Sequence, residues 1–151
     1  MVSRPRVFAR IADSRRYARG VTKPLAKEGD EVVAVDTHIV LIPSPGGPVP
    51  TPLPSPFRGP LSAELSATVF ADEKAAATVG SQAKNTPPHV PSGGPFQTPP
   101  SDQATVEMGS NTVFIDEKSA ARLGDPATTC NDPSDLMIGK VIASGTVLAG
   151  D

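Results

Sequence analysis

The chain has 151 residues, with 14 Lys and Arg against 16 Asp and Glu, and its formal net charge is −2. Its 18 Pro and 13 Gly make up about a fifth of the sequence, against a usual share of roughly an eighth, which excludes long helices over most of its length. The single Cys excludes an internal disulfide, and because no window approaches roughly 18 uncharged apolar residues, we expect neither a membrane span nor a secretory signal.

The start of the chain is basic and the remainder is acidic. Residues 1–27 carry eight basic residues and one acid, whereas residues 28–151 carry six basic residues and fifteen acids. We interpret residues 1–27 as an N-terminal extension that lies along the domain or a partner, and residues 28–151 as one folded domain. The arginines between Arg4 and Arg19 leave other interpretations open: this segment could contact nucleic acid or an anionic surface, or it could be a transit peptide.

A strand is expected over residues 31–36, Glu-Val-Val-Ala-Val-Asp. A Pro-rich stretch, residues 43–60, follows, with eight Pro among eighteen residues. Since Pro fixes φ and has no N–H donor, we expect a stiff, polyproline-like loop, with a disordered tract as the alternative. Residues 85–95 resemble the start of this stretch and predict a second Pro-rich loop.

An internal repeat occupies the middle and the end of the chain. Residues 68–80, Thr-Val-Phe-Ala-Asp-Glu-Lys-Ala-Ala-Ala-Thr-Val-Gly, match residues 112–124 at nine of thirteen positions, with an offset of 44. Each copy predicts a β-hairpin, because a β-branched and aromatic segment leads into a polar turn and a second short segment ends at Gly. A short helix over residues 72–79 is the alternative, since Ala, Glu and Lys favour helix. A truncated third copy occupies residues 144–151.

The tail predicts two further strands, over residues 140–143 and 146–148. With the strand over residues 31–36 they would pair the ends of the domain and close the sheet, which removes an open edge. The expected fold is therefore all-β, with hairpin units and Pro-rich loops in a pseudo-threefold arrangement. Five Phe and one Tyr make a thin core, and a small domain of this kind usually needs a metal, a disulfide or a partner.

The two His and the single Cys fall in three different inter-hairpin segments, His38 in the first, His89 in the second and Cys130 in the third. If these segments converge about a pseudo-threefold axis, the three side chains meet at one point. Imidazole nitrogen and thiolate sulfur suit Zn²⁺, which prefers about four such donors, and the metal would clip the three loops together. Ser55, Asp132 and a water are the candidates for the fourth donor.

These segments resemble a known family, the proline-alanine-alanine-arginine (PAAR) repeat proteins, over roughly residues 28–151. The segments that carry the resemblance are Gly-Ser-Asn-Thr-Val-Phe-Ile-Asp (109–116), Lys-Ser-Ala-Ala-Arg-Leu-Gly-Asp (118–125) with Cys130 after it, the degenerate copy at 74–80, and Ile-Ala-Ser-Gly-Thr-Val-Leu (142–148). The Pro-rich stretches are similar to those of members from phage-tail-like contractile injection systems.

The chain departs from the family pattern at several positions. The proline of the motif is Ala75 in one copy and Ser119 in the other, and its arginine is Thr78 in the first copy. Relatives commonly have a third histidine, and Ser55 stands where we would look for it.

The resemblance implies a compact β-cone with a metal-clipped apex, carried as a monomer on the trimeric β-helical spike of a contractile injection machine, type VI secretion systems included. It implies zinc near the apex, bound by His38, His89 and Cys130, with iron as the alternative ion. The implied role is non-enzymatic puncture of a target envelope, with transient membrane contact and effectors as an optional cargo. Such a protein would be cytoplasmic during assembly and then released or delivered into the target.

Three similar units in one chain suit a threefold-symmetric partner. The strands at the end of the cone opposite its apex would extend the sheets of that partner. Two other classes of function remain as alternatives. A small zinc hydrolase needs a carboxylate base beside the metal, yet no His-Glu-x-x-His signature is present and the third loop offers only Asp132 and Asp135. A nucleic-acid-binding module would use the arginine-rich arm, which has only two aromatic residues, Phe8 and Tyr17, to stack on bases, so we expect no nucleic-acid partner.

Overall fold

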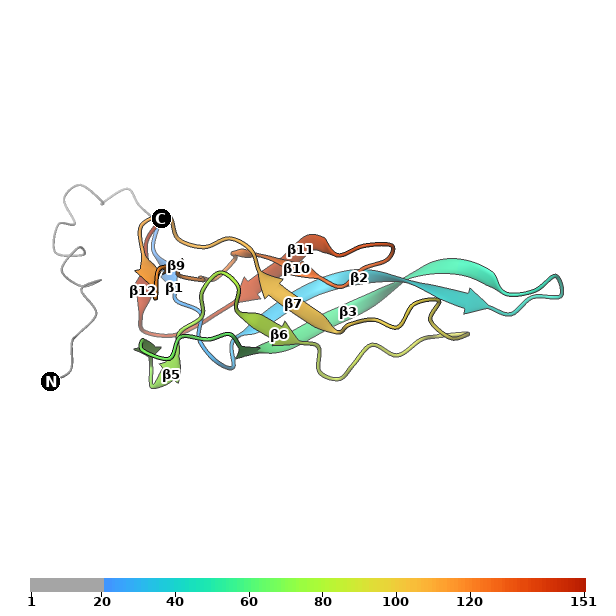
Figure 1. Ribbon diagram of the computed structural model, residues 1–151, viewed down its shortest axis with the longest axis horizontal. Coiled ribbons are helices and arrows are strands. Elements are labelled where there is room, and N and C mark those ends of the chain that lie inside the picture. Colours follow the sequence, from blue (N-terminus) through green and yellow to red (C-terminus); the bar gives the residue numbers. More distant parts are fainter. Residues whose placement is uncertain (1–20) are drawn as a thin grey trace, which may run out of the picture.

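The computed structural model describes residues 21–151, which form an all-β fold, as expected (Figure 1). Six strands close an antiparallel barrel in the order β10 (Pro126–Thr129), β11 (Leu136–Ile142), β2 (Glu31–Ile42), β3 (Val49–Ala63), β6 (Gln82–Lys84) and β7 (Gln103–Val106). Three two-stranded ribbons accompany it: β1 (Lys23–Pro24) with β12 (Leu148–Ala149), β4 (Phe70–Ala71) with β5 (Lys74–Ala75), and β8 (Phe114–Ile115) with β9 (Lys118–Ser119). None of the elements within residues 21–151 is a helix that could cross a membrane.

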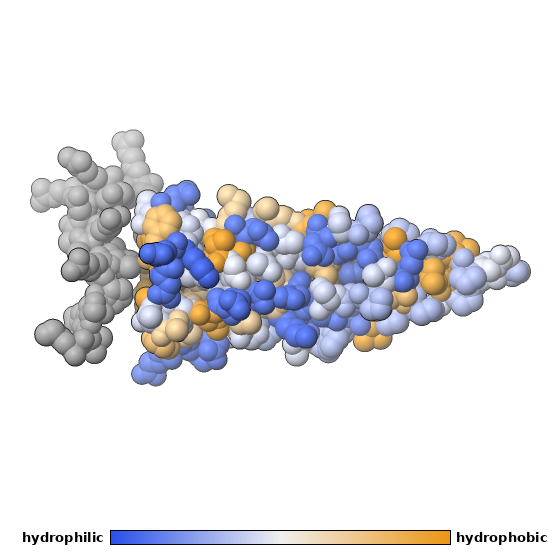
Figure 2. All heavy atoms as spheres, in the orientation of Figure 1, coloured by the Kyte–Doolittle hydropathy of each residue, from blue (hydrophilic) through white to orange (hydrophobic). Residues whose placement is uncertain are grey.

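The described residues taper from one end to the other (Figure 2). The three ribbons lie at the wide end, which we call the base, and the β2–β3 hairpin projects to the narrow end, which we call the apex (Figure 1). The expected strand over residues 31–36 is part of β2, and β11 pairs with it from Lys140↔Val33 to Ile142↔Glu31, so the tail closes the barrel as predicted.

Main-chain hydrogen bonds relate three equivalent segments at the base. The Ala26 N–H donates to Ala121 O at 2.8 Å, Ala121 N–H to Ala77 O at 3.0 Å, and Ala77 N–H to Ala26 O at 2.9 Å, which closes a ring. A second set links the same units in the opposite direction: Glu28 N–H donates to Ala75 O, Val79 N–H to Ser119 O, and Leu123 N–H to Pro24 O. The three Ala side chains of the first ring are fully buried. The units are therefore arranged with threefold pseudosymmetry at the base.

The third unit is assembled from two segments far apart in the sequence. β12 lies within the truncated third copy, and its partner β1 is Lys23–Pro24. The segment 23–29 takes the place that 74–80 and 118–124 hold in the other units, and its Gly29 has a φ of 88°, like Gly80 at 93° and Gly124 at 84°. The folded unit thus includes residues that we had expected to belong to the extension. The arginines from Arg4 to Arg19 lie outside the described residues.

Both complete copies of the repeat form hairpins, as predicted, and the alternative of a helix over residues 72–79 is wrong. The turn residues have positive φ in each copy, 47° and 67° at Asp72 and Glu73, and 50° and 66° at Asp116 and Glu117. Two consecutive residues with positive φ are typical of the type I′ turn, whose twist matches that of a two-stranded ribbon.

The Asp side chains of these turns link neighbouring units. The Asp72 carboxylate accepts hydrogen bonds from the Thr146 N–H at 2.9 Å and from the Thr146 hydroxyl. The Asp116 carboxylate accepts hydrogen bonds from Ser66 Oγ at 2.5 Å and from the Thr68 hydroxyl. These hydrogen bonds to the charged form hold the pKa of both carboxyls below its ordinary value.

We expect Asp116→Asn to lower the melting temperature at pH 7 and to have less effect in acid. A carboxyl with a depressed pKa in the folded state contributes stability above its unfolded pKa, near 4, and this contribution is lost as pH falls through the folded pKa. Thermal unfolding of both proteins between pH 7 and pH 2 measures the difference, with Glu117→Gln on the same turn as the control. A difference that stays constant over this range would contradict the assignment.

The Pro-rich stretch 43–60 is extended, but the prediction that it forms a loop is wrong outside its turn. β2 and β3 pair without interruption from Glu31↔Pro60 to Ile42↔Val49, and the turn between them is closed by the Gly47 N–H, which donates to Ser44 O at 2.9 Å. The alternation of Pro with other residues along β3 permits this pairing, because every Pro of the strand lies at a position whose N–H is not needed by β2.

The barrel core is thin, as the composition suggested. Of its 13 buried members seven are Ala, and Phe57 is the one aromatic side chain among them. Ala buries little apolar area, so this core provides less hydrophobic stabilisation than one of larger side chains.

Candidate metal centre

Four side chains gather inside the barrel at the level of the middle of β2. They are Asp36 and His38 on β2, His89 in the segment between β6 and β7, and Cys130 directly after β10. One donor atom from each lies within 4.8 Å of every other. The structure thus brings together His38, His89 and Cys130, which are 51 and 41 residues apart in the sequence.

Asp36 is the member that our reading of the sequence missed. Residues two apart on a strand place their side chains on the same face, so Asp36 necessarily follows His38 into the interior. We had expected His38 in a loop, where this rule does not apply. The pattern Asp-Thr-His, combined with an extension of the predicted strand to residue 38, was the signal that could have found it.

The distances between the donor atoms suit a tetrahedral ion. His89 Nε2 lies 3.0 Å from Asp36 Oδ2, and Cys130 Sγ lies 3.6 Å from Asp36 Oδ2 and 3.7 Å from His38 Nε2. Metal–ligand bonds of about 2.0 to 2.3 Å at tetrahedral angles place their donor atoms about 3.3 to 3.6 Å apart. These three distances are close to that range, whereas the widest donor pair, within 4.8 Å, would have to close by about 1 Å on metal binding.

The cluster is buried, and two of its four side chains, Asp36 and Cys130, have acidic groups that are negatively charged when deprotonated. Asp36 is 0% exposed, His38 1% and Cys130 3%. Burial, with the nearby Asp36 carboxylate as a second cause, raises the pKa of the Cys130 thiol to about 11. A bound divalent cation would offset both the carboxylate and the thiolate, so metal binding at neutral pH would release the thiol proton.

A second layer of polar groups orients the cluster. The other oxygen of Asp36, Oδ1, accepts hydrogen bonds from the Thr129 hydroxyl and from Asn131 Nδ2 at 3.4 Å. The Asp132 carboxylate accepts a hydrogen bond from the Ile39 N–H at 2.8 Å. The bonds to Oδ1 fix which oxygen of Asp36 faces the other donors.

Asp132, one candidate for the fourth ligand, lies outside the group of four. Asp132 Oδ2 is 3.5 Å from His38 Nδ1, on the side of the ring opposite to the Nε2 atom that faces Cys130. That Nδ1 is the one buried side-chain polar atom among residues 21–151 without a hydrogen bond. A carboxylate behind a metal-binding imidazole is a common arrangement, because it favours the tautomer with a free Nε2. Ser55, another candidate, is opposite Asp36 in the β2–β3 register, so its side chain lies beside that of Asp36 on the same face of the strand pair.

The cluster lies below the apex, not at its tip. The β2–β3 hairpin continues past His38 to the turn at 44–47. At about 3.3 Å per residue, the six residues from His38 to Ser44 extend about 20 Å further. The segment after His89 supports this projection, since the Leu41 N–H donates to Pro95 O and the Gln97 N–H to Ile39 O, both at 2.8 Å.

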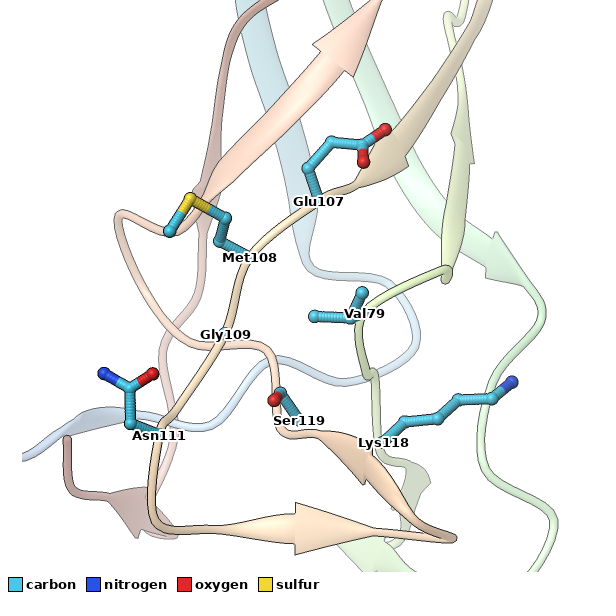
Figure 3. A pocket seen from close by; sticks show the side chains of 7 residues that line it. All are labelled: Val79, Glu107, Met108, Gly109, Asn111, Lys118 and Ser119. Atoms are coloured by element: carbon cyan, nitrogen blue, oxygen red, sulfur yellow. The ribbon is translucent and has the colours of Figure 1, made fainter.

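A shallow cleft of about 320 Å³ opens at the base, away from the cluster (Figure 3). Glu107 and Met108 after β7 and Lys118 and Ser119 of β9 contribute to its lining, and none of the four clustered side chains does.

A comparison of the sequence with protein-family models and with curated proteins finds no match.

Proposed function

We propose that this chain is a PAAR-like spike tip, which caps and sharpens the trimeric β-helical spike of a contractile injection machine and has no catalytic activity. The proposal combines the motif resemblance with the tapered shape of the described residues, whose wide base would meet the spike and whose narrow end would meet the target envelope. The machine would be of the phage-tail or type VI secretion kind, with effectors as an optional cargo.

One observation carries the proposal: the base presents three equivalent exposed apolar side chains. Phe70, Phe114 and Leu148 hold the same position in their ribbons, opposite Ala75, Ser119 and Pro24. They are 59%, 58% and 41% exposed. Large apolar side chains repeated about a pseudo-threefold axis fit the end of a trimer, because each one meets the same surface on a different chain of the partner. A single copy would thus suffice for each trimer.

The metal that suits this role is Zn²⁺ held by Asp36, His38, His89 and Cys130. Four protein donors fill a tetrahedral shell, which is typical of structural zinc sites, whereas catalytic sites keep a position for water. The donor set therefore supports a metal that stabilises the cone over the alternative of a zinc hydrolase. Iron remains the alternative ion, because thiolate and imidazole bind it as well.

The positions of the metal centre and the base also suit a mechanical role. The ion would join β2 to the segments after β6 and β10, which belong to three different units. Loads applied at the apex would thus pass through the metal centre to all three units and onto the spike below. Such a tip would be cytoplasmic during assembly and would contact the target membrane only transiently.

Binding of the purified chain to a trimeric β-helical spike protein from the same source tests the proposal. We expect one chain per trimer in light-scattering measurements, and we expect Phe70→Glu combined with Phe114→Glu to weaken binding at least about tenfold. Val90→Glu, at a 79% exposed site outside the ribbons, is the control and should bind normally. Absence of binding by the folded, metal-loaded wild type, or equal binding by the double variant, would contradict it.

A further inference from the structure

The four prolines in the apical half of β3 lie on one edge of the strand. We propose that this edge excludes pairing with any further β-strand, whether from a second copy of this chain or from another protein. The prolines are Pro50, Pro52, Pro54 and Pro56. This inference concerns the apex alone and is independent of the proposed docking of the base.

The direction of the main-chain groups of β3 follows from the bonds of its partner β2. The Leu41 N–H donates to Pro95 O, on the side of β2 that faces away from β3. In an antiparallel pair, the residue directly opposite such a residue also turns its N and O outward. Leu41 is opposite Pro50, and the direction alternates along a strand, so all four prolines turn their N and O to the outer edge of β3.

The bonds of Arg58 support this direction at the other end of the strand. Arg58 follows the four prolines in the same alternation. Its N–H donates to Asn85 Oδ1 at 2.9 Å and its O accepts from the Thr86 N–H at 3.0 Å, both on the side away from β2. Beyond Arg58, toward the apex, β3 has no strand partner on this outer side within residues 21–151.

The outer edge therefore offers acceptors and no donors at these positions. Pro has no N–H, so each of the four residues contributes only a carbonyl oxygen. All four are exposed, and within residues 21–151 no main-chain N–H donates to their carbonyls. A strand that docks here could donate its N–H groups to the proline carbonyls, but its own facing carbonyls would find no N–H donor. It would therefore form only half of the usual ladder hydrogen bonds, and these carbonyls would be buried without a partner.

The opposite edge of the apical hairpin is covered. The Thr37 N–H donates to Asn131 Oδ1 at 2.7 Å and the Ile39 N–H to Asp132 Oδ2 at 2.8 Å, while Leu41 pairs with Pro95. A long exposed two-stranded ribbon is normally a template for strand addition. Here one edge is covered and the other lacks donors, so the apex stays unpaired even where many copies are close together.

Restoring the missing donors tests the inference. We expect Pro52→Val combined with Pro54→Thr to convert the monomer into a species of about twice the mass as concentration rises, measured by light scattering. Hydrogen exchange should show that the amides introduced at residues 52 and 54 are protected in the larger species. Pro50→Thr combined with Pro52→Val, which is further from the metal centre, is a second version of the test.

Thr51→Val is the matched control, because it adds a β-branched apolar residue where the N–H already faces β2. It should remain monomeric. The inference would be overturned if both proline variants stay monomeric, if the control associates equally, or if the wild type itself pairs through this edge. Failure of both proline variants to fold would also overturn it, since the prolines would then be required for the hairpin and not for its edge.

Discussion

Replacement of Cys130 by Ala is expected to abolish metal binding and to lower the melting temperature by roughly 10 °C or more. A ligand present at about a thousandfold its Kd stabilises the folded state by about 4 kcal/mol, and each kcal/mol is worth several degrees in a domain of this size. The thin, Ala-rich core offers little to compensate. Elemental analysis and calorimetry of the same preparations measure both effects.

Comparison of two further variants distinguishes the four-residue cluster from the alternatives. Asp36→Ala should lose metal as completely as Cys130→Ala, whereas Ser55→Ala should retain it, because Asp36, His38, His89 and Cys130 already supply the four donors of a tetrahedral shell. Removal of metal from the wild type with a chelator should bring its melting temperature close to that of Cys130→Ala. The assignment would be refuted if Cys130→Ala kept its full metal content. It would also be refuted if Ser55→Ala lost the metal while Asp36→Ala retained it.

Gly59→Ala is expected to destabilise the protein by about 3 kcal/mol, a large effect for the addition of a single methyl group. Gly59 is buried on β3, where a Cβ would lie 2.4 Å from Lys84 O and 2.9 Å from Asn85 N. Both neighbours are main-chain atoms, so relief requires β3 and the end of β6 to move apart. Urea denaturation at fixed metal content measures the change.

Gly46→Ala at the turn of the same hairpin is the matched control. A Cβ at Gly46 meets no atom within 4 Å, and we expect a change within about 0.5 kcal/mol. Equal stability of the two variants would show that β3 and β6 are not as close as described.

The repeat made the hairpins and their threefold relation predictable, because nine identical positions imply the same local conformation. It also placed His38, His89 and Cys130 at one level without any knowledge of the strands around them. The same reasoning found only the tail half of the third unit, because its other half is the distant segment Lys23–Pro24. A search for contiguous copies cannot find a unit that is divided between distant segments.

The prediction that the Pro-rich segment 43–60 forms a loop was wrong for a different reason. Pro was treated as a residue that excludes pairing, yet an edge strand needs donors only on alternate residues. Once β3 is accepted as a strand, β2 extends past residue 36, and Asp36 and His38 fall on the same inward face. The missed ligand and the missed strand therefore have one cause, which is the assumption that Pro excludes strand pairing.

The split third unit also sets when the base can close during synthesis of the chain. β1 leaves the ribosome early, but its partner β12 comes 125 residues later. At about 5 to 20 residues per second, the nascent chain waits about 6 to 25 s before the base can close. β1, the first strand of the described residues, thus has no native strand partner until almost all of residues 21–151 have been translated.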